Sequence, residues 1–307
     1  MTDETVAVVS AGDMGHAVGA VLANSGLEVI TALDGRSQRT RDLAAKAGMV
    51  DVGDADTLVA RAGILLSIIP PDQALGFADR ISAAVKSAGA DLVFVDCNAI
   101  SPDTTGKLGA IVTASGARFV DAGIVGGPPK IGGKGPRFYA SGEAAGAFAV
   151  LADHGLDVRV IGDAVGRASA LKMCYAAITK GAALLGTGAL VTAEVMGVGD
   201  LLLAELRSSQ AAMLDWLAGR TPRMPPKAYR WVGEMEEIAA TYKSAGLTPS
   251  FHLGAAEMCR FIEASPLGQE VPEKRTMGTT LEGVIEHLAE FASAPEPGPS
   301  PAAAKGG

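Results

Sequence analysis

Cysteine and aromatic residues are scarce in this chain of 307 residues. Its three cysteines, Cys97, Cys174 and Cys259, are far apart and form no CxxC pair, and its four histidines show no metal-ligand spacing. We therefore expect neither a disulfide framework nor a metal site, and a reducing compartment such as the cytoplasm fits. Aromatic residues make up only 5% of the chain, which disfavours an aromatic-rich β-sandwich.

The chain also lacks a positive charge excess and long uninterrupted apolar runs. Its net charge of -8 argues against a nucleic-acid binder, which would normally carry a basic face. The apolar stretches are short and broken by charge or glycine, so no membrane span is expected, and no basic segment suggests a signal peptide. We expect a soluble cytoplasmic protein that acts on a small-molecule substrate.

Apolar residues are abundant, and they follow two different patterns in the two halves of the chain. Apolar residues make up 48% of the chain, enough for two domain cores. The first half alternates short β-branched runs with helical stretches, which predicts βαβ units and a parallel sheet. Strands are expected at residues 6–9, 27–33, 63–69, 91–95, 118–120, 137–141 and 158–161, and helices at 16–25, 37–47, 73–88 and 104–115.

After Gly162 the strand signals vanish. Helices are expected at residues 166–196, 201–217, 229–244, 251–263 and 280–292, the first of them apolar almost all round and therefore buried. The predicted organisation is an α/β Rossmann domain at 1–163 and an all-α domain at 164–294. A Pro/Gly/Ala-rich tail at 295–307 is expected to be disordered.

A glycine-bearing turn follows the first expected strand. It reads Ser10, Ala11, Gly12, Asp13, Met14 and Gly15, a G-x-G-x-x-G pattern with serine at the first glycine position. Gly12 would let backbone N–H groups approach a pyrophosphate, and Gly15 would let the next helix pack closely on the sheet. Placed between a strand and a helix, the turn predicts a dinucleotide cofactor.

The end of the second expected strand carries both an acid and a base. Asp34 would accept a hydrogen bond from a free ribose 2′-hydroxyl, whereas Arg36 and Ser37 would donate to a 2′-phosphate. We expect NADP(H) to be preferred, with NAD(H) as the alternative. A solvated helix start is the alternative explanation of these residues.

Five ordered segments resemble the β-hydroxyacid dehydrogenase / 6-phosphogluconate dehydrogenase superfamily, which includes the imine reductases. They are Gly12–Gly15, Ile69–Asp72, Val95–Pro102, Phe119–Gly127 and Gly166–Lys172. The match spans roughly residues 5 to 180, and the remainder resembles a bacterial branch whose C-terminal domain is uncharacterised. The resemblance implies a homodimer joined through helical domains and an active site between the two domains.

The resemblance also assigns roles to individual residues. Ile69, Pro70 and Pro71 would shape a loop beside the nicotinamide ribose. Asn98 would contact the cofactor, and Ser101 would contact the substrate.

Lys172 occupies the position of the family's catalytic lysine. Reduction of a carbonyl by hydride leaves an alkoxide that needs a proton, and a lysine in an apolar helix without a neighbouring acid can supply it. Tyr175 lies one turn further along and would donate to the substrate oxygen. The alternative is a lysine whose head reaches the surface.

Two positions depart from the family pattern. Val125 stands where a serine usually precedes the glycine pair Gly126 and Gly127 that lines the substrate site, and Ala176 replaces the usual asparagine. Both changes point to a substrate that is less polar than a simple hydroxy acid or is anchored differently. The basic loop at 128–137 and His252 are further candidates for substrate contact, without a definite role.

The function expected from the sequence is hydride transfer between a nicotinamide cofactor and a small alcohol or carbonyl compound of the hydroxyacid type. Lys172 would be the general acid or base. Two alternatives stay open: an imine reductase, which delivers hydride to C=N, and a nucleotide-binding sensor without turnover.

Overall fold

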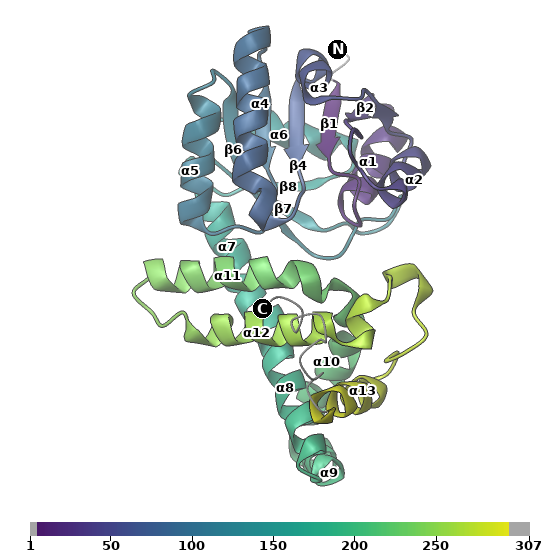
Figure 1. The fold of residues 1–307 in the computed structure, drawn as a ribbon. Coiled ribbons are helices and arrows are strands. Elements are labelled where there is room, and N and C mark those ends of the chain that lie inside the picture. The colour runs from purple at the N-terminus through teal and green to yellow at the C-terminus, as the bar shows by residue number, and fades with distance from the viewer. Residues whose placement is uncertain (1–4, 295–307) are drawn as a thin grey trace, which may run out of the picture. The chain divides into compact units, whose positions relative to one another are not determined.

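A computed structural model describes residues 5–294 of the chain, so the tail predicted at 295–307 lies outside the described residues. The described chain forms two compact units (Figure 1). The sheet unit comprises residues 5–177 and 236–250, and the helical unit comprises residues 178–235 and 251–294. The sequence placed the boundary at residue 163, whereas the units divide after Ala177, because the helix that begins at Arg167 packs on the sheet.

One eight-stranded sheet organises the sheet unit, with strand order β3-β2-β1-β4-β5-β6-β7-β8. The strands are β1 (Val6–Val9), β2 (Val29–Thr31), β3 (Val50–Asp51), β4 (Ile64–Ser67), β5 (Val93–Asp96), β6 (Arg118–Val125), β7 (Arg137–Ser141) and β8 (Asp157–Val160). All neighbours are parallel except β6 and β7, which form an antiparallel hairpin. The predicted Rossmann-type α/β fold is confirmed, although the two-residue strand β3 was not foreseen.

Helices cover both faces of this sheet. They are α1 (Gly15–Asn24), α2 (Gln38–Lys46), α3 (Ala55–Arg61), α4 (Ala74–Ala88), α5 (Pro102–Thr113) and α6 (Ala145–Ala149). Val6 and Val8 of β1 pack with α1, α2 and α6, whereas Ala7 and Val9 pack with α3, α4 and α5. Figure 1 shows α4 and α5 side by side on one face. This alternation explains why strands buried on both faces read as continuous apolar runs.

A continuous helical stretch of 29 residues runs from Arg167 to Val195. It consists of α7 (Arg167–Ala176), a π-helical turn (Ala177–Gly181) and α8 (Ala182–Val195). The expectation of a buried helix is wrong, because only 39% of its most apolar window is buried and Leu185 is 76% exposed. By length and hydropathy alone this stretch would qualify as a membrane span, a test that core helices of soluble proteins also pass.

The remaining helices are α9 (Gly199–Ser209), α10 (Ala211–Arg220), α11 (Ala228–Ser244), α12 (Ser250–Ala264) and α13 (Leu281–Ser293). Leucines from α8, α9, α10 and α13 form one core of the helical unit, together with Ile285. The single helix predicted at 201–217 is two helices, because the chain leaves helical geometry at Gln210 (φ -139°, ψ 40°). The break lets Leu203 of α9 and Leu214 of α10 pack into the same core.

Candidate cofactor and active site

The carboxyl ends of β1, β4, β5 and β6 lie at one edge of the sheet. These four strands are consecutive parallel neighbours, and each is followed by a segment singled out in the sequence. The strand order reverses between β1 and β4, because β2 lies on one side of β1 and β4 on the other. In open α/β sheets, ligands bind outside the carboxyl ends at such a switch point.

The glycine-bearing turn after β1 is tied to the neighbouring strand. Ser10 N–H donates to Ile68 O at 3.2 Å. A Cβ at Gly15 would overlap the Ser10 carbonyl oxygen, so glycine is required where α1 begins. A Cβ at Gly12 would meet only Ser10 Oγ, at 4.0 Å, so folding alone does not demand glycine there. Open space above Gly12 at a helix N-terminus suits an approaching pyrophosphate.

The other residues of the turn contribute backbone or support. Ala11 is fully buried in the core, so only its backbone can face a ligand. The Asp13 carboxylate accepts from Arg39 of α2 at 2.7 Å, which offsets its negative charge beside the expected phosphate position. Met14 is the N-cap residue of α1 and has no side-chain capping bond.

Asn98 holds the proline turn that follows β4. Its Oδ1 accepts from Ile69 N–H at 2.7 Å, and its Nδ2 donates to Ser67 Oγ and to Asp96 Oδ1. With 3% of its surface exposed, Asn98 acts through Ile69, which is followed by Pro70 of the same turn. The structure therefore places Asn98 as a positioning residue for this turn.

Ser101 caps helix α5. Its Oγ accepts from Thr104 N–H at 3.2 Å, and its own N–H donates to Glu237 Oε2 at 2.7 Å. Thr104 Oγ1 donates to the same Glu237 oxygen at 2.9 Å. Ser101 is 1% exposed, so its hydroxyl serves the helix start in this structure.

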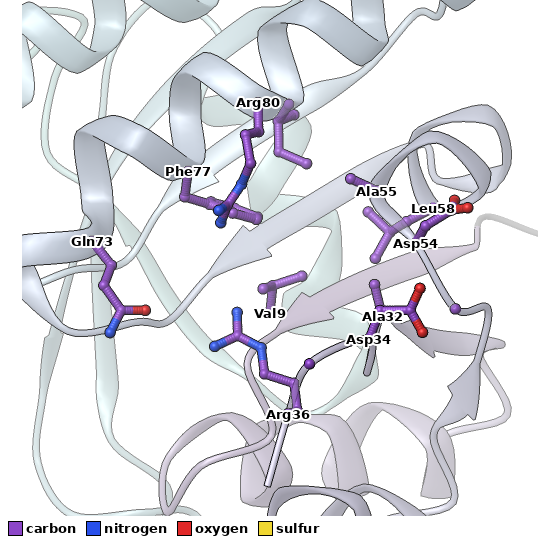
Figure 2. Close-up of a pocket in the computed structure, with 13 residues that line it drawn as sticks. Val9, Ala32, Asp34, Arg36, Asp54, Ala55, Leu58, Gln73, Phe77 and Arg80 are labelled. Carbon is purple, nitrogen blue, oxygen red and sulfur yellow. The ribbon is translucent and has the colours of Figure 1, made fainter.

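A cavity of about 310 Å³ opens beside the ends of β1 and β2 (Figure 2). Its apolar lining comes from β1, α3, α4 and the chain after β2, and consists of Val9, Ala32, Ala55, Leu58, Phe77 and Ile81. Its polar lining consists of Asp34, Arg36, Asp54, Gln73 and Arg80. An apolar slot with a few charged groups at its rim suits the adenosine part of a dinucleotide.

Arg36 enters this cavity because Gly35 turns the chain. Gly35 has φ 70°, in the left-handed region that favours glycine. Burial lowers the pKa of Arg36, and the nearby positive charge of Arg80 lowers it further. Ser37 does not line the cavity, and its Oγ instead caps α2 by accepting from Thr40 N–H at 3.3 Å.

Lys172 lies in α7 against the end of β6. Its Nζ donates to the backbone carbonyl oxygen of Ile124, so its ammonium has a neutral partner on β6. A Cβ at Gly123 would approach Lys172 Cβ to 2.9 Å and Ala168 O to 2.8 Å, which shows how closely α7 packs on β6. Lys172 thus lies at the edge of the sheet that carries the glycine turn.

Asp121 of β6 anchors the start of α7, a role that the sequence did not reveal. It is fully buried, and its Oδ2 accepts from the N–H groups of Gly166, Ala168 and Ser169 at 2.8–3.2 Å. Ser169 Oγ donates to Oδ1 at 2.6 Å, and Ser141 Oγ donates to Oδ2 at 2.9 Å. A carboxylate at a helix N-terminus satisfies otherwise unpaired donors and favours the helix dipole.

The predicted substrate residues divide between core and surface. Val125 ends β6 and is 3% exposed, whereas Gly126 and Gly127 are exposed in the hairpin loop that leads to β7. Tyr175 is 41% exposed. The loop at 128–137 connects β6 to β7 and so belongs to their hairpin. His252 lies in the helical unit with its ring beside Gly181, and its role stays a prediction.

The sequence of this chain is similar to known proteins of one family. Residues 5–153 match the NAD binding domain of 6-phosphogluconate dehydrogenase, and residues 193–262 match a domain of unknown function, DUF1932. An uncharacterized 28.5 kDa protein in the 7S RNA 5′ region of Methanothermus fervidus is 32% identical over 238 residues, which are 77% of this chain and 90% of that protein. The chain belongs to the 6-phosphogluconate dehydrogenase-like superfamily.

Several solved structures share the fold of this chain. Mycobacterium tuberculosis 3-hydroxyisobutyrate dehydrogenase, solved with L-serine, has a TM-score of 0.65 at 19% identity over 93% of this chain and 99% of its own. An imine reductase from Myxococcus stipitatus, solved with NADP+, has a TM-score of 0.55 at 19% identity over 85% of this chain and 93% of its own. As a superfamily member, the chain is placed among NAD(P)-dependent oxidoreductases.

The family pattern indicated some candidate site residues and missed others. Lys172 and the turn around Gly12 were recognisable from sequence because their neighbours follow the superfamily pattern. Asp121 lay inside a recognised segment, but its role depends on β6 lying against α7. Arg80 carried no sequence signal, because it is one charged residue on the exposed side of a helix. Within residues 5–294, no cluster of three metal-ligating side chains occurs.

Proposed function

We propose that this protein transfers hydride between NADP(H) and a small alcohol or carbonyl compound of the hydroxyacid type, with Lys172 as the general acid or base. The observation that carries the proposal is the position of Lys172 Nζ, which donates to Ile124 O at the carboxyl end of β6. The glycine turn, the proline turn and Asn98 follow neighbouring strands at the same edge. A cofactor and a proton donor would therefore serve one site.

The residues of the chain have distinct tasks in this proposal. A bound nicotinamide cofactor supplies or accepts the hydride. Lys172 delivers a proton to the oxygen that becomes the alcohol, or removes it in the reverse direction. Ile124 O aims the ammonium, and Asp121 fixes the helix from which Lys172 extends. Tyr175, one helical turn later, would donate a hydrogen bond to the same substrate oxygen.

The preference for NADP(H) rests on the rim of the adenosine cavity. Arg36 lines it from the loop after β2, where the substituent on the ribose 2′-carbon is recognised in Rossmann domains. Asp34 also lines the cavity, but its carboxylate points away from the Arg36 guanidinium (Figure 2). NAD(H), which an acid at this position would favour, is the weaker candidate.

The absence of polar side chains at two positions supports a narrower choice of substrate. Val125 and Ala176 are 3% and 2% exposed, and neither side chain can hold a carboxylate. A less polar carbonyl compound therefore fits better than a simple hydroxy acid. The same observation favours a second candidate, reduction of a C=N bond, because an imine needs no carboxylate contact. A nucleotide-binding sensor without turnover is the third candidate.

One substitution and one substrate panel test these candidates. Lys172→Ala should abolish turnover while NADPH binding, followed by fluorescence titration, stays unchanged. Lys107→Ala removes an exposed lysine on α5 and should leave both unchanged. An active Lys172→Ala enzyme would remove Lys172 from the chemistry. Aldehydes, hydroxy acids and cyclic imines distinguish the first two candidates, and no turnover across the panel would favour the sensor.

We also propose that the protein is a cytoplasmic homodimer. Several apolar side chains of the helical unit are 70–76% exposed: Ile178, Leu185, Met196, Leu201 and Phe251. Large exposed apolar side chains in this number are typical of surfaces that another protein covers. A second copy is the partner that the superfamily resemblance implies.

A further inference from the structure

Two arginines from distant parts of the sequence line the adenosine cavity. Arg36 follows β2, and Arg80 lies in α4, after β4. Figure 2 shows both guanidinium groups pointing into the cavity and toward each other. Their charges interact, since Arg80 contributes to the lowered pKa of Arg36. Two like charges that face one cavity repel each other until an anion lies between them.

The acids of the cavity do not neutralise this pair. Asp54 also lines the cavity, but its carboxylate caps α3 by accepting from Thr57 N–H at 2.8 Å. In Figure 2 the carboxylates of Asp34 and Asp54 both point away from the two guanidinium groups. The space between the arginines is therefore positive, and a ligand has to supply the compensating charge.

Arg80 is held on the apolar wall of the cavity. Its Cζ lies 5.8 Å from the centroid of the Phe77 ring, one turn earlier in α4. Phe77 is 5% exposed and packs in the core, so it gives the arginine a rigid support. A guanidinium held on an aromatic face keeps its N–H groups free to bind a phosphate in its plane.

We propose that Arg80 is a specificity-determining residue that binds the ribose 2′-phosphate of NADP(H) from the side opposite Arg36. The inference rests on the proposed use of NADP(H) and extends it to a residue outside the loop after β2. Arg36 and Arg80 together form a clamp whose two guanidinium groups share one dianion. Binding of that dianion also relieves their mutual repulsion, so each arginine contributes to discrimination against NAD(H).

The test compares adenosine 2′,5′-bisphosphate with 5′-AMP, which differ only in the 2′-phosphate. Both are titrated calorimetrically into the full chain, so the readout is independent of turnover. Arg80→Met, which keeps an unbranched stem against Phe77, should weaken the bisphosphate by at least about tenfold and 5′-AMP by less than about twofold. Lys86→Ala removes a positive charge from the exposed side of the same helix and should change neither affinity.

Other outcomes overturn the inference in distinguishable ways. Equal losses for both nucleotides would mean that Arg80 contacts the adenine or supports the cavity. Unchanged affinities for both would remove Arg80 from the site. A wild-type protein that binds both nucleotides equally would overturn the proposed NADP(H) preference itself, and binding of neither would overturn the proposed cofactor function.

A double-mutant cycle with Arg36→Ala adds a second criterion. If both arginines bind the same phosphate, the losses for the bisphosphate are not additive, whereas 5′-AMP shows no coupling. Additive losses would assign the arginines to separate contacts and contradict the clamp.

Discussion

Asn98 Oδ1 accepts a hydrogen bond at 2.7 Å from the backbone N–H of Ile69. This bond joins the end of β5 to the proline turn after β4, and Ser10 N–H joins that turn to the glycine turn after β1. Three consecutive strand ends are thus connected across the switch point of the sheet. A site assembled from separate loops needs such supports to hold its geometry.

Asn98→Ala should therefore destabilise the fold and loosen the proline turn. The buried N–H of Ile69 would lose its acceptor, at a cost of about 2 kcal/mol in the free energy of unfolding, measured in urea. NADPH affinity should fall, whereas the affinity for adenosine 2′,5′-bisphosphate should change less, because Asn98 and Ile69 do not line the adenosine cavity. Asn24→Ala, at the exposed end of α1, is the matched control. Unchanged NADPH affinity would contradict this support role.

Alanine substitution should affect stability at Gly15 and cofactor affinity at Gly12. A Cβ at Gly15 would overlap Ser10 O, so Gly15→Ala should cost about 1–3 kcal/mol of unfolding free energy. A Cβ at Gly12 meets open space, so Gly12→Ala should leave the unfolding free energy within about 0.5 kcal/mol of wild type. Its NADPH affinity should nevertheless fall in a fluorescence titration. Wild-type affinity in Gly12→Ala would exclude close approach of the pyrophosphate.

Asp121 should act on catalysis through Lys172. Asp121→Asn replaces an acceptor of several hydrogen bonds with an amide, and we expect a loss of about 3 kcal/mol or more of unfolding free energy. Ser169→Ala removes the bond to Asp121 Oδ1 and a bond with Thr105 Oγ1, and it should cost about 2 kcal/mol while the protein still folds. In both variants kcat should fall more than NADPH affinity. Asp79→Asn, on the exposed side of α4, is the control.

If kcat and NADPH affinity fell in parallel for Ser169→Ala, Asp121 would be a general stabiliser of the fold. A selective fall in kcat identifies it as a positioning residue.

Asp96 should make stability depend on pH. Burial raises the pKa of its carboxyl group well above the ordinary 3.8, the nearby Asp121 carboxylate raises it further, and a hydrogen bond from Asn98 opposes both. Because the folded pKa is raised, the stabilising contribution is complete below 3.8 and is lost as pH rises toward the folded value. Within residues 5–294, Asp96 Oδ2 accepts no hydrogen bond, which fits a disfavoured charge.

Asp96→Asn should remove this loss. The stability of the variant relative to wild type should increase with pH above the unfolded pKa, by up to about 1.4 kcal/mol per pH unit. Urea unfolding from about pH 4 to about pH 8 measures the difference between the two proteins and cancels the other groups. A difference that does not vary with pH would mean that Asp96 titrates alike in both states.

Aspartate substitutions on the exposed apolar surface of the helical unit should dissociate the proposed homodimer. If a second copy covers it, Ile178→Asp and Leu185→Asp should shift the mass measured by size-exclusion light scattering from dimer to monomer. Ile131→Asp, on the exposed β6–β7 loop, should leave the mass unchanged. A monomeric wild-type protein would contradict the proposed homodimer.

Much of the fold was accessible from local sequence. The alternating apolar runs located seven of the eight strands, and the glycine turn after Val9 identified where α1 begins. The two-residue strand β3 was missed because Val50 and Asp51 form no apolar run. Residues 201–217 were predicted as one helix because the break at Gln210 has no glycine or proline. The long helix at 166–196 was predicted as buried because it is apolar on all sides. Composition alone does not reveal that only part of its apolar surface packs against the rest of the chain.

The amino-acid sequence by itself determined the Rossmann-type order of strands and helices, the glycine turn and the position of Lys172, since these depend on neighbours along the chain. Only the tertiary structure decided that Asn98 supports the proline turn, that Asp121 holds α7, and that Arg80 faces Arg36. The physical reason is distance along the chain. Hydrogen bonds and charge interactions between segments tens of residues apart exist only after the sheet has brought strand ends together.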